Sequence, residues 1–223
     1  MQSCDWFVTC GEVMNLPKQT FLNLPEKKRE RILRCAVEEF AQKGYKQASI
    51  TRMVEAAKIA KGSFYQYFED KGDLFIHIVV TQIGAIKLDI LEREARRLKE
   101  INLTEFLRHV FRAQIRAFNA RPELYKISMD LTQMTGEPVY EKLLQNYQDV
   151  IPTYFESVIR HEIEQGEIDA RVNAQLLNFM LMSMGDYMLF QLTSGAVSDF
   201  SEQYLDKLVD DMDFILSNGI YAK

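Results

Sequence analysis

The chain is poor in the residues that build disulfide frameworks, fibres and loose linkers. Its 223 residues include 3 Cys, 5 Pro, 10 Gly and 1 Trp. So few Pro and Gly exclude a collagen-like or low-complexity architecture. Cys4, Cys10 and Cys35 are odd in number and lack CxxC spacing, which excludes a disulfide framework and favours a reducing compartment. A metal site is not expected, because all 3 His lie far downstream of Cys4 and Cys10.

A basic leader and a long uninterrupted apolar run are also missing. The first residues carry Asp5 and Glu12 without an early cluster of Lys or Arg, unlike a signal peptide. The most apolar stretch, 176–192, contains Asn178 and Asp186 and is shorter than the ~20 apolar residues of a membrane helix. The sequence therefore predicts a soluble, cytoplasmic protein with no membrane partner.

Charge is distributed unevenly along the chain. Hydrophobic residues make up 47% and charged residues 26%, which is enough for a folded core, and the net charge is −5. Residues 16–71 nevertheless carry 12 Lys and Arg against 7 Asp and Glu, whereas residues 72–223 carry 15 against 23. A basic module joined to an acidic body suggests that the two parts do different work, the first on nucleic acid.

The apolar periodicity is helical almost everywhere and predicts an all-α fold of about nine helices. Ser49 and Asp70 are suited to capping helix N-termini, Gly44 and Gly166 to ending helices, and Pro152 to kinking or splitting one. The expected helices span 26–43, 50–57, 61–67, 70–99, 103–119, 122–134, 137–165, 171–193 and 198–217. We predict a tail over 1–24, with Met14 as a second possible start, a helix-turn-helix domain over 25–70 and a larger helical domain over 71–223.

The helices over 50–57 and 61–67 are separated by a turn of three to four residues, which is the spacing of a helix-turn-helix. Phe64 and Phe68, at i and i+4, anchor the short helix to the core. Its polar groups then lie on or near outward faces, where such a helix reads the major groove: Lys61, Ser63, Tyr65, Gln66 and Tyr67.

Two motifs within residues 31–75 carry a family resemblance. They are F-x-x-x-G-Y at 40–45 and KGSFYQYF-x-x-K at 61–71. With them, this stretch resembles the N-terminal domain of TetR/AcrR-type transcriptional regulators. The resemblance implies that Lys61, Gly62, Ser63 and Gln66 lie near base edges or the adjoining backbone of double-stranded DNA. It implies phosphate contacts for Ser49, Tyr65, Tyr67 and Lys71.

The sequence departs from the family pattern at two positions of the turn. Lys58 stands where the family usually has Gly, and Ala60 stands where a Ser or Thr usually caps the recognition helix. A left-handed Lys58 and a missing cap would each cost about 1 kcal/mol. A phosphate contact made by Lys58 is one possible compensation.

The last two predicted helices favour a homodimer. The helix over 171–193 is apolar nearly all round, and the helix over 198–217 has a narrower apolar stripe. Pairing about a two-fold axis would bury both in a four-helix bundle, which is also where the resemblance places the dimer. The alternative is an intramolecular core. The predicted interface residues are Met180, Met188, Tyr204, Leu205, Leu208 and Met212.

Aromatic and Met residues in the body are candidates for a small-molecule site, because such side chains form adaptable apolar cavities. Asp186 is an unusual acid among them, and pairing with Arg116, a place at the dimer seam and a cationic ligand are its three alternatives. Ordinary core packing is the alternative for the whole set. The candidates are Phe106, His109, Arg116, Tyr125, Met129, Tyr154, Met184, Asp186, Tyr187 and Phe190.

These features predict a ligand-responsive repressor that binds a palindromic operator as a dimer and is released by a small, largely apolar effector. No Gly-rich phosphate loop, G-x-S-x-G or H-E-x-x-H motif is present, so neither an enzyme nor a cofactor is expected. The alternative is a small-molecule-binding or protein-interaction dimer whose helix-turn-helix no longer binds DNA.

Overall fold

The computed structural model describes residues 17–95, 102–147, 151–193 and 202–218, and every regular element among them is a helix. This confirms the all-α prediction for the described part of the chain. These residues form two compact units. Of the described residues, the first unit comprises 17–86 and 121–147, and the second comprises 87–95, 102–120, 151–193 and 202–218.

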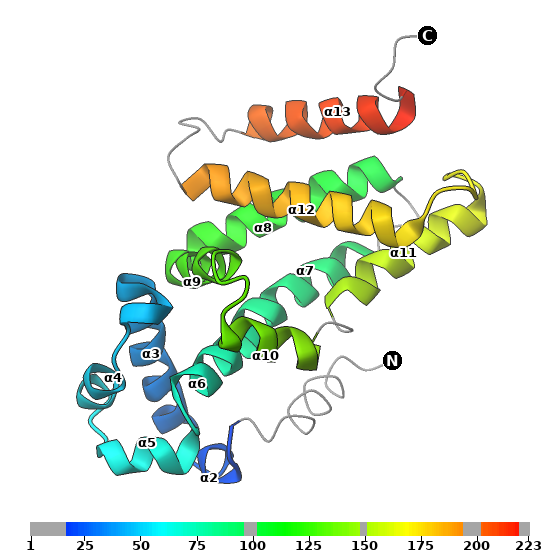
Figure 1. The fold of residues 1–223 in the computed structure, drawn as a ribbon. Helices are drawn as coiled ribbons and strands as arrows, with labels where there is room; N and C mark the ends of the chain where they lie inside the picture. The colour runs from blue at the N-terminus through cyan, green and yellow to red at the C-terminus, as the bar shows by residue number, and fades with distance from the viewer. Residues whose placement is uncertain (1–16, 96–101, 148–150, 194–201, 219–223) are drawn as a thin grey trace. The chain divides into compact units, whose positions relative to one another are not determined.

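The first unit begins with a short helix, α2 (Gln19–Leu22), followed by α3 (Glu26–Gln47), α4 (Ile50–Ala56) and α5 (Lys61–Tyr67) (Figure 1). Gly44 has a φ of 68°, so the helical geometry of α3 breaks immediately after the predicted end at residue 43. The predicted caps are also present. Ser49 Oγ accepts from the Arg52 amide at 3.5 Å, and Asp70 Oδ1 accepts from the Asp73 amide at 2.9 Å.

Aromatic side chains form much of the core of the first unit. Phe40 and Phe75 meet edge to face with ring centroids 5.1 Å apart, and both are at most 2% exposed. Phe21 of α2 packs against Phe68 at 4.9 Å and is equally buried. Residues 17–24 are therefore part of this folded unit rather than of a leading tail, which corrects the predicted boundary at 24.

The predicted helix over 70–99 is present as far as Ala95, where the described segment ends, but it is not uniform. It consists of α6 (Lys71–Ile78), a π-helical turn η1 (Val79–Gly84) and α7 (Ala85–Ala95). Among the described residues, Lys71–Leu91 is one stretch long and apolar enough to cross a membrane by length and composition. Since 56% of it is buried inside the protein, its apolar character is that of a core helix.

Two later helices, α9 (Pro122–Thr132) and α10 (Pro138–Tyr147), pack in the first unit. The Tyr45 amide donates to Asp130 Oδ2 at 2.5 Å, and Lys142 Nζ pairs at 2.5 Å with Asp73, which is fully buried. These contacts join α9 and α10 to residues around the helix-turn-helix. The compact unit is consequently larger than the 25–70 domain that the sequence predicts.

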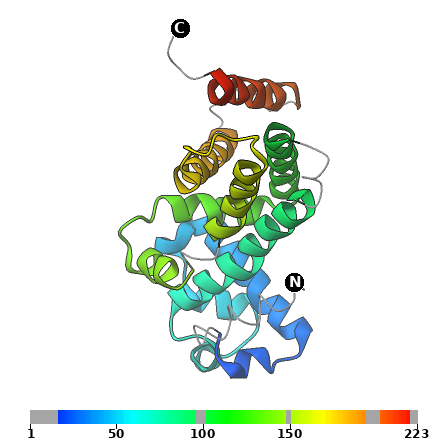
Figure 2. The same ribbon diagram turned by 90° about the vertical axis from the view of Figure 1, so that its right-hand side faces the viewer.

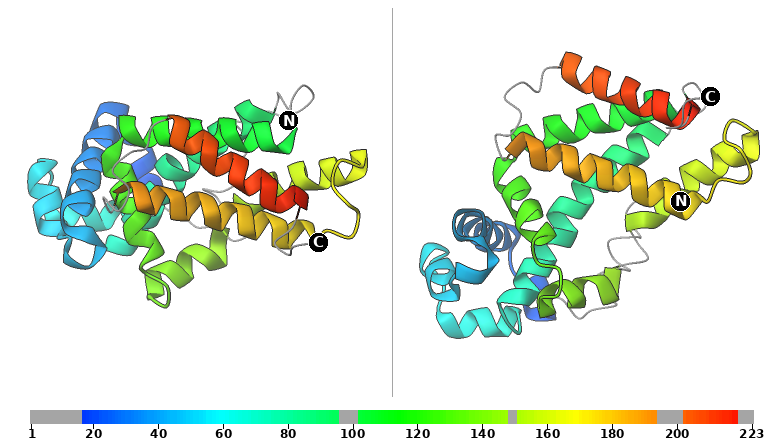
Figure 3. Two further views of the ribbon diagram at one scale, coloured as in Figure 1. Left: turned by 90° about the horizontal axis from the view of Figure 1, so that it is seen from above. Right: turned by 45° about the horizontal axis from the view of Figure 1, so that its top comes forward.

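The second unit contains most of α7 together with α8 (Leu103–Ala120), α11 (Ile151–Gln165), α12 (Ala174–Thr193) and α13 (Glu202–Asn218). The predicted helix over 137–165 is described in two parts, α10 as far as Tyr147 and α11 from Ile151, and the residues between them lie outside the described part of the chain. Helices α11 and α12 pack together (Figure 2), and α13 packs along α8 (Figure 3).

Candidate nucleic-acid interface and effector cavity

The turn between α4 and α5 is a Schellman motif built on a lysine. Lys58 has a φ of 53°, the one positive φ at a non-Gly position in the described chain. Its amide donates to the Glu55 carbonyl at 3.1 Å, and the Ile59 amide donates to the Val54 carbonyl at 3.0 Å. These are the two hydrogen bonds of the motif, in which Gly usually occupies the left-handed position. Lys58 therefore adopts the left-handed conformation that Gly usually provides at this position.

Helix α5 begins without a side-chain cap. Ala60 occupies the N-cap position, and only its carbonyl takes part, accepting from the Ser63 amide at 2.9 Å. No side-chain oxygen satisfies the first amides of the helix, as the sequence predicts. These amides remain available to another acceptor, and a DNA phosphate is the kind of group that helix N-termini bind.

One face of α5 is exposed and the other is buried. Lys61, Gly62 and Gln66 are exposed, Tyr65 is 46% exposed, and Ser63 is partly exposed. A Cβ added at Gly62 would meet no atom within 4 Å. The absence of a side chain at Gly62 is therefore not required by packing within the chain, whereas close approach of DNA to the backbone would require it.

Tyr67 faces the core rather than the outward side predicted for it. It is 5% exposed, and its ring lies 5.9 Å from that of Phe21. Lys28 Nζ lies 5.9 Å from the centroid of the Tyr67 ring. Because α2 covers this face, Tyr67 is a packing residue, and the expected phosphate contact is not retained.

Lys71 also has a different role from the predicted one. Its ammonium donates to the carbonyl oxygens of Tyr45 at 2.6 Å, Lys46 at 3.2 Å and Ala48 at 3.1 Å. An ammonium has three N–H donors, so these contacts occupy all of them. Burial lowers the pKa of Lys71. Lys71 therefore holds the carbonyls at the end of α3, and it is not retained as a phosphate ligand.

Ser49 caps α4 with its side chain, and its backbone amide makes a second contact. Its amide donates to Glu39 Oε1 at 2.9 Å, and Arg52 Nε donates to the same oxygen at 2.8 Å. The hydrogen bond from Arg52 lowers the pKa of Glu39 and keeps that carboxylate charged. Ser49 is partly exposed, so a phosphate contact by its hydroxyl stays a prediction.

Helix α2 holds the C-terminal end of α5, a role that the sequence did not reveal. The Lys18 amide donates to the Tyr67 carbonyl at 2.9 Å, and Lys18 Nζ donates to the Tyr65 carbonyl at 2.9 Å. The Thr20 hydroxyl donates to the Gln66 carbonyl. Three of the last four carbonyls of α5 thus find donors in one preceding segment. The sequence feature that could have indicated this role is Phe21, an aromatic residue four positions before Pro25.

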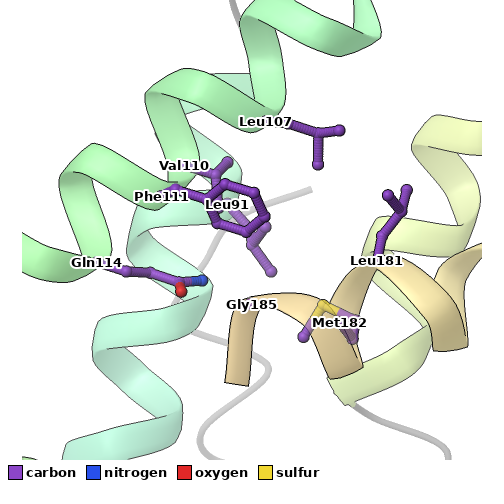
Figure 4. A pocket seen from close by; sticks show the side chains of 8 residues that line it. All are labelled: Leu91, Leu107, Val110, Phe111, Gln114, Leu181, Met182 and Gly185. Carbon is purple, nitrogen blue, oxygen red and sulfur yellow. The ribbon is translucent and has the colours of Figure 1, made fainter. Parts of the chain in front are cut away.

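The second unit contains a small cavity between α7, α8 and α12 (Figure 4). Its volume is about 10 Å³, which is space for roughly one water molecule. Gly185 of α12 makes the closest approach, because a Cβ there would lie 3.0 Å from Phe111 Cε1 of α8. Gln114 supplies the amide in an otherwise apolar wall: Leu91, Leu107, Val110, Phe111, Gln114, Leu181, Met182 and Gly185 line the cavity.

None of the eight predicted ligand residues whose side chains the structure describes lines this cavity. Phe106 is fully buried in α8, and His109 Nδ1 lies 3.5 Å from Glu94 Oε2. Of the other predicted ligand residues, Tyr125 and Met129 belong to the first unit. Four are exposed, namely Arg116, Met184, Tyr187 and Phe190. The side chains of Tyr154 and Asp186 lie outside the described residues. Residue type identified apolar helices but not which face of each helix lines a cavity.

The predicted dimer residues also separate into two groups. Leu205 and Met212 are 3% exposed, because this face of α13 packs on α8 within the protomer. Their assignment to the interface was wrong. Met180 is 46% exposed, Tyr204 and Leu208 are partly buried, and the side chain of Met188 lies outside the described residues.

Helices α12 and α13 instead expose a set of large apolar side chains that the prediction largely missed. On α12 they recur every three or four residues, so they share one face. Phe179 at 68% and Tyr187 at 60% are the most exposed of them. Among the described residues, the set consists of Leu176, Phe179, Met180, Met184, Tyr187 and Phe190 on α12, with Phe214, Ile215 and Leu216 on α13.

The helix-turn-helix matches a known family. Residues 32–78, which contain α4, the left-handed turn and α5, match the model described as bacterial regulatory proteins, tetR family. The helix-turn-helix of the chain is therefore of the TetR type. A curated relative with similarity over most of the chain is the HTH-type transcriptional repressor AcnR of Corynebacterium glutamicum. It is 24% identical over 186 residues, covering 82% of this chain and 90% of AcnR.

Solved structures share the fold of this chain over most of its length. A putative TetR-family regulator from Syntrophomonas wolfei superposes with a TM-score of 0.68 at 18% identity, covering 88% of this chain and 98% of the other. The regulator FadR of Bacillus subtilis, in complex with stearoyl-CoA, superposes with a TM-score of 0.63 at 23% identity, covering 86% and 99%. At these identities the likeness concerns the fold.

Proposed function

We propose that this protein is a cytoplasmic repressor of the TetR type that binds a palindromic operator as a homodimer and is released by an uncharged, largely apolar effector. The observation that carries the DNA-binding part is the exposed face of α5. There Lys61, Gly62, Tyr65 and Gln66 point away from a helix fixed at its start by the α4 turn and at its end by α2. A rigid short helix with a polar outer face suits major-groove recognition.

The exposed apolar face of α12 supports the dimer. Large side chains such as Phe179 and Tyr187 are rarely left in water as a contiguous patch, and such patches mark protein–protein contacts. One short recognition helix makes few base contacts, whereas two related by a two-fold axis read successive major grooves about 34 Å apart. The pair Phe179→Glu and Tyr187→Glu is expected to yield monomers that lose operator binding.

The cavity of the second unit supports the effector class. The described residues of its lining include no charged side chain, so an ionic group placed among them would lose its hydration without a partner. The Gln114 side chain offers an NH₂ group as donor and a carbonyl oxygen as acceptor to an otherwise apolar molecule. Since the cavity holds about one water, an effector of any size must separate α12 from α8 as it enters.

Selection of sequences from a random DNA duplex pool at two salt concentrations tests the DNA-binding part. A palindromic motif with two half-sites and a steep loss of affinity with salt is the expected result. Weak binding without sequence preference would overturn it. It would favour the alternative of a helical dimer that does not bind DNA, with Lys58 and Ala60 as the local cause.

A panel of uncharged apolar molecules tests the effector part with the selected operator as probe. A true effector raises the melting temperature of the free protein and weakens operator binding, because both follow from tighter binding to the DNA-free state. A Gly185→Leu variant, which fills the space beside Phe111, is expected to lose the response. If no molecule changes either quantity, the effector proposal fails.

A further inference from the structure

A second hollow lies in the first unit, away from the exposed face of α5. It is a groove of about 970 Å³ between α3, η1 and the start of α9. This volume lies within the range of small-molecule sites, about 300–1,000 Å³. Leu33 and Val37 form an apolar part of its wall. Four basic and three acidic side chains form the charged part.

The basic side chains of the groove are not equally neutralised. Arg34 pairs with Glu38 at 4.0 Å, and Arg121 pairs with Glu123 at 2.6 Å. Arg31 has no ion pair within the described chain, and its Nε is a buried donor without a hydrogen-bond partner. A buried N–H left without an acceptor is costly, and most such groups in native proteins have a partner. The buried Nε–H of Arg31 therefore lacks the hydrogen-bond acceptor that such a group usually has.

The part of the groove lining that comes from η1 has an unusual backbone. Thr81 and Gln82 belong to η1, and π-helical turns inside α-helices occur frequently at functional sites. Gln82 Oε1 accepts from Arg121 at 3.4 Å, so the NH₂ group of Gln82 is a second donor on this wall. Two donors beside apolar side chains suit an acceptor group attached to a hydrocarbon body.

We infer that this groove binds a small organic carboxylate, held at its charged end by Arg31 and Gln82 and along its apolar part by Leu33 and Val37. A guanidinium presents parallel N–H donors that match the two oxygens of a carboxylate. The site is separate from the apolar cavity of the second unit and from the DNA-facing side of α5. The inference therefore stands whether or not the proposed effector exists.

Hexanoate is a suitable probe, with hexanamide as its uncharged counterpart and ionic strength held constant with NaCl. Hexanoate is expected to raise the melting temperature of the full chain saturably in the millimolar range, and hexanamide is not. Arg31→Gln should weaken hexanoate binding about tenfold or more. Arg34→Gln is the matched control on the same helix, and it should keep hexanoate binding because Arg34 is already paired and 70% exposed.

The Nε resonance of Arg31 in a ¹H–¹⁵N spectrum gives a second readout that does not need a stable variant. It is expected to shift on addition of hexanoate and not of hexanamide. Equal binding of both probes, an equal hexanoate response in Arg31→Gln, or an unshifted Arg31 resonance would each overturn the inference. A response that rises linearly without saturation would also overturn it, since that is the behaviour of general salt stabilisation.

Discussion

The backbone amide of Lys18 donates to the carbonyl oxygen of Tyr67 at 2.9 Å, which joins the segment before the helix-turn-helix to the last residue of the recognition helix. Forty-nine positions separate the two residues, yet this bond and the contacts of Thr20 and Phe21 fix the end of α5. The orientation of α5 thus depends on residues outside the helix-turn-helix itself.

Phe21 is expected to be essential for the first unit. Phe21→Ala would leave a cavity beside Phe68 and cost about 3–5 kcal/mol in the free energy of unfolding. Leu22→Ala is the matched control, because Leu22 is 46% exposed and its truncation should cost little. Urea denaturation of both variants measures the difference. Equal losses would mean that α2 does not pack as described.

Thr20→Val separates positioning from stability. The substitution keeps the volume of the side chain but removes the hydroxyl that donates to the Gln66 carbonyl. We expect the free energy of unfolding to fall by about 1 kcal/mol. The free energy of operator binding should fall by a larger fraction of its value, because the exposed face of α5 is no longer fixed. Operator binding measured well below the melting temperature distinguishes the two effects. Unchanged affinity would exclude a positioning role for Thr20.

Lys58 carries a conformational cost that glycine would remove. Lys58→Gly is expected to gain about 1 kcal/mol in stability, because the left-handed position disfavours a Cβ. Lys58→Ala removes the same charge but retains the Cβ, so it should not show this gain. If Lys58 also contacts a phosphate, both variants should lower the salt slope of DNA binding by about 1. An unchanged slope in Lys58→Gly would exclude that contact.

Gly62 offers a test in which stability and DNA binding should move in opposite directions. Gly62→Ala should stabilise the free protein by up to about 1 kcal/mol, because Ala favours helix and the added methyl meets no atom. The same methyl should weaken operator binding where the backbone of α5 approaches DNA. Thermal melting and operator titration of one preparation measure both. Improved stability with unchanged affinity would contradict the close approach.

The burial of His77 predicts that the first unit loses stability as the pH falls. Burial beside Phe21 lowers the pKa of its imidazole from 6.5 to about 4, so the folded state holds the neutral form whereas the unfolded chain binds a proton near pH 6.5. This contribution to stability is complete above about pH 6.5 and decreases as the pH falls towards 4, by a total on the order of 3 kcal/mol.

Urea denaturation at several pH values between 7 and 4, on the wild type and on His77→Leu, measures this contribution. The variant should lose less stability on acidification, because its side chain does not titrate. Carboxylates titrate in both proteins over the same range, so the difference between the two curves isolates His77. Parallel curves would contradict the burial of a neutral imidazole.

Features that depend on neighbours within four or five positions could be predicted from the sequence. Helix periodicity, the caps at Ser49 and Asp70, the break at Gly44 and the left-handed turn at Lys58 all follow from local backbone sterics and hydrogen bonding. The motif residues of α5 likewise pointed to a DNA reader. These features were predicted from the pattern and are present in the structure.

The partners of long side chains, in contrast, depend on how the helices pack against one another. Lys71 reaches carbonyls at Tyr45, Lys46 and Ala48, and Tyr67 turns towards Phe21, because those groups meet only after the helices pack. Several side chains that were predicted to line the effector cavity or the dimer interface also lie elsewhere in the structure. The sum of many distant contacts selects the buried face of each helix, whereas an apolar pattern alone shows only that such a face exists.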